Sequence, residues 1–251
     1  MLKLSHVKKS FGGIIATNDL SIDFAQGSLS AIIGPNGAGK TTLFNLISGR
    51  IHPDSGSILF NGEEIAGRSA TEIVRKGIAR AFQVSSIFPS FTVQQSFEAA
   101  VLAHRGQMSN LFKPFSQPSS RERASELMEM MGLQRRAHTL SRHLPHGEQK
   151  LLDIGLALAL EPRLLLLDEP TAGMGPEERI QMIERVHGLW EKEQITVIFI
   201  EHDMDIVFEH AQIIRVLYYG ALLAEGTAEE IRNNQAVIDA YLGSGFTEEA
   251  I

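Results

Sequence analysis

One glycine-rich string constrains the fold of this chain more than any other feature. It reads Gly34-Pro-Asn-Gly-Ala-Gly39-Lys40-Thr41 and satisfies every fixed position of the pattern G-x-x-x-x-G-K-[ST]. The mostly apolar run Leu29–Ile33 precedes the string, and Thr41–Ser48 has helical spacing. Strand, glycine loop and helix, in this order, are the parts of a phosphate-binding loop. The string therefore predicts an anion site between a strand and a helix.

Each residue type in this loop has a chemical reason. The glycines let the backbone curl, so that successive N–H groups point at one anion, and the following helix adds the positive end of its dipole. Lys40 can reach the β- and γ-phosphates of a nucleotide, and the Thr41 hydroxyl can complete a Mg²⁺ shell. At ordinary residue frequencies roughly 0.01 such strings are expected by chance in a chain of this length. A chance match is therefore a poor explanation.

A second chemical feature is an acidic pair at the end of an apolar run. Asp168 and Glu169 follow Leu164–Leu167 directly. Acids in this position lie at the carboxyl edge of a parallel sheet, where open α/β folds bind ligands. There Asp168 can hold Mg²⁺, directly or through water, and Glu169 can polarise an attacking water. Solvated acids that merely end a strand are the alternative, and the phosphate loop upstream disfavours it.

The rest of the chain alternates strand-like and helical segments. Uninterrupted apolar runs at Leu164–Leu167 and Ile195–Ile200 are typical of parallel strands buried on both faces. We expect further strands at Leu2–Val7, Ser21–Phe24 and Ile213–Leu217, helices at Thr92–His104, Arg121–Met131, Gln149–Leu160, Ala228–Arg232 and Gln235–Tyr241, and a loop at Gly106–Ser120. The pattern predicts a parallel α/β core with a helical insertion between about Val84 and Leu144.

Composition excludes several classes of protein. The 251 residues contain no cysteine, which excludes a disulfide framework, a cysteine-based metal site and a catalytic thiol. The formal net charge of −7 disfavours a sequence-independent grip on nucleic acid. A membrane-spanning helix needs about 20 mostly apolar residues, and no stretch of that kind is present. The lysines at the start are followed by no apolar stretch, so we expect no secretory signal.

These motifs and their order resemble the ATP-binding cassette (ABC) ATPases, the motor subunits of ABC transporters, over essentially the whole chain. The resemblance implies a P-loop NTPase (RecA-like) α/β core with an N-terminal antiparallel β-subdomain and an inserted α-helical subdomain. It implies one domain over residues 1–251, with residues 1–83 and 150–251 as the nucleotide-binding core. Residues 84–149 are then the helical insertion with the family's signature segment.

The resemblance also implies roles for single residues, with ATP and Mg²⁺ as cofactors. Phe11 matches the aromatic residue that stacks on adenine, and Gln83 matches the glutamine that touches Mg²⁺ or water and faces the permease. Taken alone, Phe11 would more often be a core residue, Gln83 a loop residue and His202 a structural or surface residue, and only their spacing around the phosphate loop favours the functional roles. The residues implied for catalysis are Glu169, His202 and Lys40, and His202 would contact the γ-phosphate. The residues implied for the metal are Thr41, Gln83 and Asp168. The residues implied for ATP binding are Phe11, Gly34, Pro35, Asn36, Gly37, Ala38, Gly39, Lys40, Thr41, Thr42 and Gln83.

The signature segment departs from the family pattern. The family's Leu-Ser-Gly-Gly-Gln corresponds here to Leu144, Pro145, His146, Gly147 and Glu148. In the family this segment reaches across a dimer interface to the partner's ATP. Pro145 has neither a hydroxyl nor an N–H, so one hydrogen-bond donor is missing. Gly147 and the helix N-terminus remain, so we expect anion binding there to be weakened rather than abolished.

A second departure concerns the partner. In Ala172-Gly-Met-Gly175 the family usually has an aspartate at the last position, and this side chain crosses the dimer interface. A partner with an intact signature would complete the ATP site that this chain's own phosphate loop forms. The opposite ATP site, which uses this chain's altered signature, would be impaired. We therefore expect a second ABC ATPase subunit that is a different chain, with a homodimer left open. The resemblance further implies two permease subunits and, indirectly, a solute-binding protein.

Three phrases resemble the branched-chain amino acid importer branch: Ser10–Ala16, Ile198–Met204 and the tail Ala224–Leu242. Ala172–Met174 is similar to the members of that branch that take up urea and short amides. We expect the tail to lie away from ATP, and the chain to work at the cytoplasmic face of the inner membrane. The alternatives left open are a nucleotide-binding subunit with weak hydrolysis, a cassette that acts on ribosomes or DNA, and an exporter motor.

Overall fold

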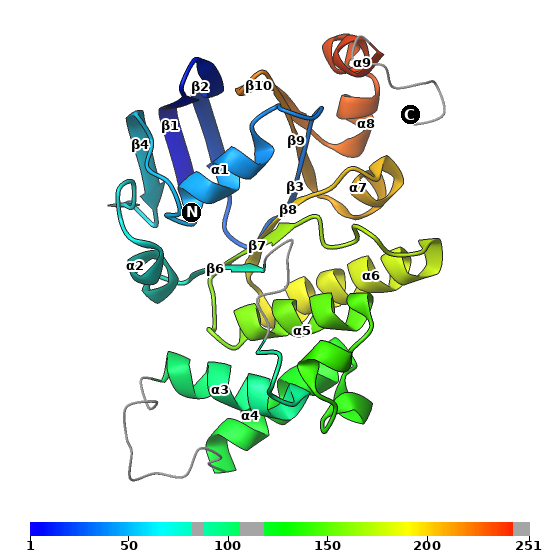
Figure 1. Cartoon of the computed structure of the whole chain (residues 1–251). Coiled ribbons are helices and arrows are strands. Elements are labelled where there is room, and N and C mark those ends of the chain that lie inside the picture. The colour runs from blue at the N-terminus through cyan, green and yellow to red at the C-terminus, as the bar shows by residue number, and fades with distance from the viewer. Residues whose placement is uncertain (82–87, 106–117, 243–251) are drawn as a thin grey trace. The chain divides into compact units, whose positions relative to one another are not determined.

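The computed structural model describes residues 1–81, 88–105 and 118–242 (Figure 1). The chain divides into two compact units. Unit 1 combines Met1–Lys76 with the segment from Gln194 onward, and unit 2 is the continuous stretch Gly77–Glu193. Because both ends of the chain contribute to unit 1, it is discontinuous in sequence.

Unit 1 contains an antiparallel sheet with the strand order β2-β1-β4-β5. Its strands are β1 (Leu2–Phe11), β2 (Ile14–Phe24), β4 (Ser55–Phe60) and β5 (Glu63–Glu64). Leu2 and Leu4 are buried on one face of β1 while Lys3 between them is exposed, which is the period of two that a half-buried strand requires. The two N-terminal strands that we expected are therefore confirmed, and both are longer than their apolar patterns.

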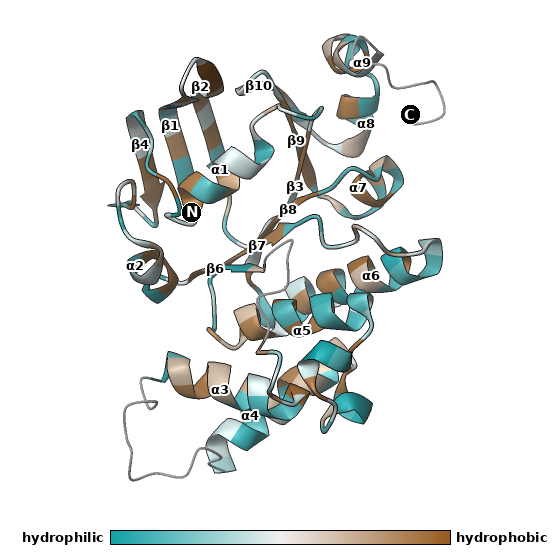
Figure 2. Ribbon diagram, viewed as in Figure 1, coloured by the Kyte–Doolittle hydropathy of each residue, from teal (hydrophilic) through white to brown (hydrophobic). Residues whose placement is uncertain are grey.

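The second sheet of unit 1 holds the central strand of the predicted parallel core. Its strands are β3 (Leu29–Ile33), β8 (Thr196–Ile200), β9 (Ile213–Tyr218) and β10 (Ala221–Gly226), in the order β10-β9-β3-β8. β3 pairs in parallel with both β8 and β9, whereas β10 pairs antiparallel with β9. Every residue of β3 and β8 is buried, as their mostly apolar sequences indicate (Figure 2).

The helices of unit 1 are short. They are α1 (Lys40–Ile47), α2 (Ala70–Arg75), α7 (Met204–His210), α8 (Ala228–Arg232) and α9 (Gln235–Leu242). Ser69 and Thr227 begin α2 and α8 with capping boxes, and the Asp203 side chain caps α7. Such caps matter here because helices of this length are marginal without tertiary support.

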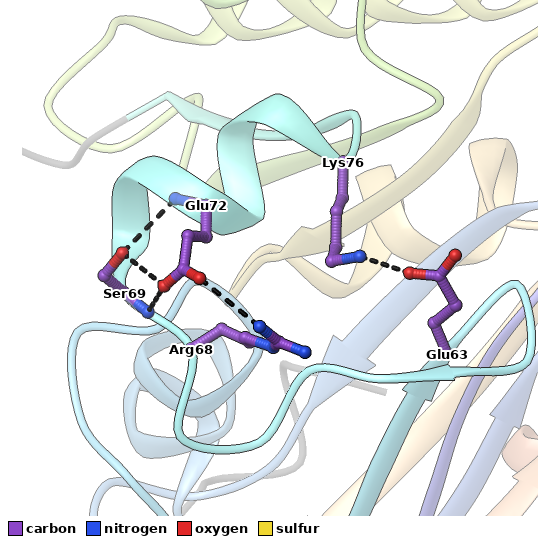
Figure 3. Close-up of polar contacts among 5 residues, drawn as sticks. All are labelled: Glu63, Arg68, Ser69, Glu72 and Lys76. Atoms are coloured by element: carbon purple, nitrogen blue, oxygen red, sulfur yellow. Dashed lines mark hydrogen bonds and ion pairs between the residues drawn. The ribbon is translucent and has the colours of Figure 1, made fainter.

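The contacts around α2 show how a six-residue helix is fixed (Figure 3). The Glu72 carboxylate accepts hydrogen bonds from the Ser69 N–H at 2.9 Å and the Ser69 hydroxyl at 2.7 Å. These hydrogen bonds, that of the hydroxyl above all, lower the pKa of Glu72. Arg68 adds an ion pair to Glu72 at 3.4 Å, and Lys76 beyond the helix contacts Glu63 of β5. Both ends of α2 are thus tied to neighbouring chain.

Unit 2 combines two parallel strands with helices. Strand β6 (Ile78–Ala81) pairs with β7 (Leu164–Asp168), and the helices are α3 (Val93–His104), α4 (Pro118–Met131), α5 (His146–Leu158) and α6 (Pro176–Glu193). Short 3-10 turns occupy Gln134–Arg136 and Ser141–His143. Helices α3 and α4 lie side by side, and both contact α5 (Figure 1). A Cβ on Gly155 would lie 2.5 Å from the Phe97 ring, so this glycine allows α3 and α5 to approach closely.

The observed boundaries differ from the expected ones mainly at helix starts. Helix α5 begins at His146 instead of Gln149, and α4 begins at Pro118, inside the expected loop. The sheets and helices together form the mixed α/β class that we predicted. The division into residues 1–83 with 150–251 and residues 84–149 stays a prediction. Within the described part of the chain, no helix has the length and apolar character needed to span a bilayer.

Candidate nucleotide-binding site

The phosphate loop joins β3 to α1 in unit 1. Its glycines adopt backbone angles that other residues rarely take: φ is +148° at Gly34, +81° at Gly37 and +101° at Gly39. Space is also limiting, because a Cβ on Gly34 would lie 2.2 Å from the Leu217 carbonyl oxygen. A Cβ on Gly39 would lie 2.3 Å from the carbonyl oxygen of Ala16. The loop therefore needs glycine at both ends to fit between β2 and β9.

Lys40 and Thr41 open α1 at the end of this loop. The Lys40 side chain bends back over the loop, where its ammonium donates hydrogen bonds to the carbonyls of Gly34 at 2.6 Å and Pro35 at 3.1 Å. Lys40 is buried, whereas Thr41 is exposed. A buried ammonium held against a loop of backbone N–H groups is suited to a multiply charged anion such as a nucleotide's phosphates.

His202 leaves the same edge of the sheet as the phosphate loop. Strands β3 and β8 run parallel with Ile32 opposite Ile200, so the residues that follow each strand emerge together. His202 is exposed, and its backbone N–H donates to a Glu201 carboxylate oxygen at 3.2 Å. The sheet of unit 1 thus brings together two of the sequence-predicted features, the loop and the histidine.

Phe11 lies at the end of β1 and is 48% exposed. The alternative that Phe11 is a core residue is therefore wrong. The Lys9 ammonium lies 5.5 Å from the centre of the Phe11 ring. Asp54 fixes this end of the strand, because its carboxylate accepts hydrogen bonds from the Lys9 ammonium and the Ser10 N–H, both at 2.7 Å. An exposed aromatic ring on a fixed strand end is suited to stacking on a planar ligand.

The Asp54 contacts predict a pH dependence of stability. The hydrogen bond from Lys9, followed by those from Ser10, lowers the pKa of Asp54 from 3.8 to about 2. Because the folded pKa lies below the unfolded one, this contribution to stability is complete above about pH 4 and is lost as the pH falls toward 2. Urea unfolding of wild type and Asp54→Asn at several pH values checks this. We expect the wild-type advantage to shrink across this window, and parallel pH profiles would contradict it.

The C-terminal tail touches the loop as well. A backbone hydrogen bond from Gly34 reaches the phenol of Tyr241 in α9, and burial raises the pKa of this phenol. Our expectation that the tail lies away from ATP stays a prediction, and Tyr241 is a tail residue that contacts the first glycine of the phosphate loop. No local pattern could have indicated a contact between residues so far apart in sequence.

In unit 2, Asp168 is the last residue of β7 and is paired with an arginine. The Arg80 guanidinium of β6 lies 2.6 Å from the Asp168 carboxylate, and the two side chains are 5% and 3% exposed. Arg80 is not among the site residues expected from the sequence, although a charged residue inside the short strand Ile78–Ala81 is a detectable signal. The pair orients a carboxylate of the kind that Mg²⁺ uses together with phosphate oxygens.

Glu169 follows Asp168 in an unusual conformation. Its φ is +50°, the left-handed region that residues with a side chain seldom adopt. The Glu169 carbonyl accepts a hydrogen bond from the ammonium of Lys150, in α5, at 2.8 Å. Glu169 is half-buried, at the carboxyl end of β7 where we expected the catalytic base.

The signature-like segment forms the start of α5. Leu144 is buried, and Pro145 is the N-cap residue but provides no side-chain cap. The hydrogen-bond donor that we expected Pro145 to lack is therefore missing at the N-cap position of α5. Glu148 is oriented by Arg136, whose Nε lies 2.9 Å from its carboxylate. A Cβ on Gly173 would lie 3.4 Å from the His146 ring, which places the segment beside the loop that follows β7.

Gly175 lies just before α6, and its N–H donates to the Glu178 carboxylate at 3.2 Å. A Cβ at Gly175 would meet no atom within 4 Å. The fold of unit 2 would therefore accept a larger residue here, so packing does not explain the absence of aspartate. Gln83, the remaining site residue that we expected, lies outside the described residues.

Comparison with known proteins identifies the family. Residues 17–172 match the profile of the ABC transporter family. The chain belongs to this family. Residues 221–247 of the cassette match a second profile, described as branched-chain amino acid ATP-binding cassette transporter. The predicted resemblance is therefore confirmed, including its branch.

Individual relatives agree over nearly the whole cassette. BraF of Pseudomonas aeruginosa, a high-affinity branched-chain amino acid transport ATP-binding protein, is 37% identical over 97% of this chain and 98% of its own. The ADP conformation of MJ1267, an ATP-binding cassette of an ABC transporter, has a TM-score of 0.85 at 30% identity over 97% of this chain and 98% of its own. A dimeric post-hydrolysis state of MJ0796 bound to ADP and Pi has a TM-score of 0.77 at 25% identity over 91% and 99% of the two chains. The P-loop NTPase fold class and an ATPase activity tied to transport are thereby confirmed, with nucleotide as the ligand.

Proposed function

We propose that the cassette is the ATP-hydrolysing motor subunit of an importer for branched-chain or other hydrophobic amino acids. The match of residues 221–247 to the branched-chain cassette profile carries this proposal, because this tail distinguishes the branch from other cassettes. The likeness to BraF over nearly the full length supports it.

The proposed chemistry assigns each residue a task. The backbone of Gly34–Thr42 and the Lys40 ammonium hold the phosphates, and the exposed Phe11 ring stacks on adenine. Thr41, Gln83 and Asp168 would hold Mg²⁺, which neutralises charge on the β- and γ-phosphates when it is bound. Glu169 orients and polarises the attacking water, and His202 contacts the γ-phosphate. Their positions at the carboxyl ends of β7 and β8 support these roles.

The proposed working assembly is a dimer of cassettes on two permease subunits at the cytoplasmic face of the inner membrane. A solute-binding protein delivers the solute to this assembly. The segment Leu144–Glu148 faces the partner's ATP in this arrangement. The dimeric state of MJ0796 with ADP and Pi supports cassette pairing. Because Pro145 provides no cap, we propose a different cassette with an intact signature as the partner.

Two alternatives have specific support. Ala172–Met174 is similar to the urea and short-amide importers, which favours those solutes. The uncapped helix start at Pro145 favours a subunit that binds ATP but hydrolyses it weakly.

Reconstitution tests the proposal. The cassette is combined with two permease subunits, a partner cassette and a solute-binding protein, and uptake of labelled leucine and urea into vesicles is measured with phosphate release. Leucine uptake that depends on ATP supports the proposal. Uptake of urea without leucine would show that urea, and not an amino acid, is the transported solute. Equal, undiminished hydrolysis at both sites of a purified homodimer would contradict the mixed pair.

A further inference from the structure

One buried lysine connects the signature-like segment to the residue proposed as the catalytic base. Lys150 lies about one turn inside α5, which begins at His146, and it is only 4% exposed. Its ammonium donates hydrogen bonds to the carbonyl oxygens of Glu169 at 2.8 Å and Ala172 at 2.9 Å. A buried ammonium is costly unless hydrogen-bond acceptors surround it, so this lysine is built into the loop and is not a solvated surface residue.

The backbone that Lys150 holds is strained. Glu169 has a φ of +50°, and such a conformation persists only where the surrounding structure imposes it. The Glu169 carbonyl also accepts the Ala172 N–H at 3.2 Å, which closes a turn. The ammonium therefore fixes both ends of this turn. Since the backbone angles at Glu169 set the direction of its Cα–Cβ bond, holding this carbonyl limits where the side chain can point.

The same loop touches the first turn of α5. A Cβ on Gly173 would lie 3.4 Å from the His146 ring, and a Cβ on Gly147 would lie 3.7 Å from the Met174 methyl group. The helix and the loop after β7 therefore meet at the signature-like segment and again at Lys150. A displacement of α5 along its axis would be transmitted to the Glu169 peptide through these contacts.

We propose that Lys150 is a positioning residue that couples the start of α5 to the orientation of Glu169. When the signature-like segment engages a partner's nucleotide, the Lys150 ammonium aligns the base of this chain's own site. This route does not need the aspartate that is missing at Gly175. The inference rests on the proposed function, because it requires Glu169 to be the base and the segment to face a partner.

The test compares Lys150→Met, which keeps the length but removes the donors, with Lys150→Arg, which keeps donors and charge. Both are measured in the complete transporter, with Lys192→Met as a matched change at an exposed lysine of α6. We expect Lys150→Met to lower kcat by about 10- to 100-fold, with KM for ATP changed less than about threefold. We expect the Hill coefficient for ATP to fall toward 1, Lys150→Arg to recover much of kcat, and Lys192→Met to behave as wild type.

Equilibrium binding of a fluorescent ATP analogue gives the fraction of folded cassette in each sample. A normal kcat and Hill coefficient in Lys150→Met would overturn the inference. A loss of kcat that is fully explained by a smaller fraction of folded cassette would overturn it as well. If Lys150→Met does not fold, Lys150→Gln takes its place, and equal kcat values for wild type, Arg and Gln variants would overturn the inference. Glu169→Gln in the same assay separates the two proposals: if it hydrolyses ATP normally, the proposed base fails, whatever Lys150 does.

Discussion

Replacing Glu169, the proposed general base, with glutamine is expected to slow ATP hydrolysis by about 10³-fold, because removal of a general base costs between about 10² and 10⁴ in rate. ATP binding should persist, since the proposed phosphate contacts come from the loop Gly34–Thr41 and not from Glu169. Glutamine keeps the size and polarity of the side chain, so the turn that Glu169 shares with Ala172 should remain. The loss should therefore appear in kcat and not in KM.

Phosphate release and binding of a fluorescent ATP analogue measure the two quantities separately. Glu177→Gln, at an exposed acid in the first turn of α6, is the matched control and should hydrolyse ATP at the wild-type rate. Normal turnover by Glu169→Gln would show that another group activates the water. Loss of both binding and turnover would instead indicate damage to the fold.

Replacing Arg80 with methionine should lower the free energy of unfolding by about 3–5 kcal/mol, the range for removing one partner of a buried ion pair. The Arg80 guanidinium lies 2.6 Å from Asp168, and both side chains are almost fully buried. Without it the buried Asp168 carboxylate would lose the guanidinium that pairs with it. Urea unfolding of the Arg80→Met variant and of wild type measures the effect.

Two controls make this result specific. Arg75→Met removes an exposed arginine at the end of α2 and should change stability by less than about 0.5 kcal/mol. The double variant Arg80→Met with Asp168→Leu should recover part of the loss, since it removes the buried charge as well as its partner. If Arg80→Met costs no more than Arg75→Met, the ion pair does not stabilise unit 2.

The parts of the fold that could be predicted are those with a local signal. The strands β3, β7 and β8 are mostly apolar because they are buried, and the loop string has fixed spacing. We expected α5 to start later than it does, because its first turn contains His146 and Gly147, which are weak helix formers and follow a proline. The helical pattern becomes visible only from Gln149 onward.

The parts of the site that were missed depend on contacts between distant residues. Arg80 meets Asp168 across 88 positions, and Lys150 meets carbonyl oxygens 19 and 22 residues away. Every residue type has a backbone carbonyl, so no sequence pattern could have revealed the Lys150 contacts. Tyr241 reaches Gly34 from the opposite end of the chain. Sequence therefore predicted the groups proposed for the chemistry but not those that hold them.

The discontinuity of unit 1 has a consequence for the newly made chain. Strand β3, which carries the phosphate loop, has β8 and β9 as its two neighbours, and these begin only at Thr196 and Ile213. During synthesis unit 2, which ends at Glu193, is complete before either neighbour has left the ribosome. The strand that positions the loop is thus made early but paired late. Competence to bind nucleotide should consequently be among the last properties that the nascent polypeptide acquires.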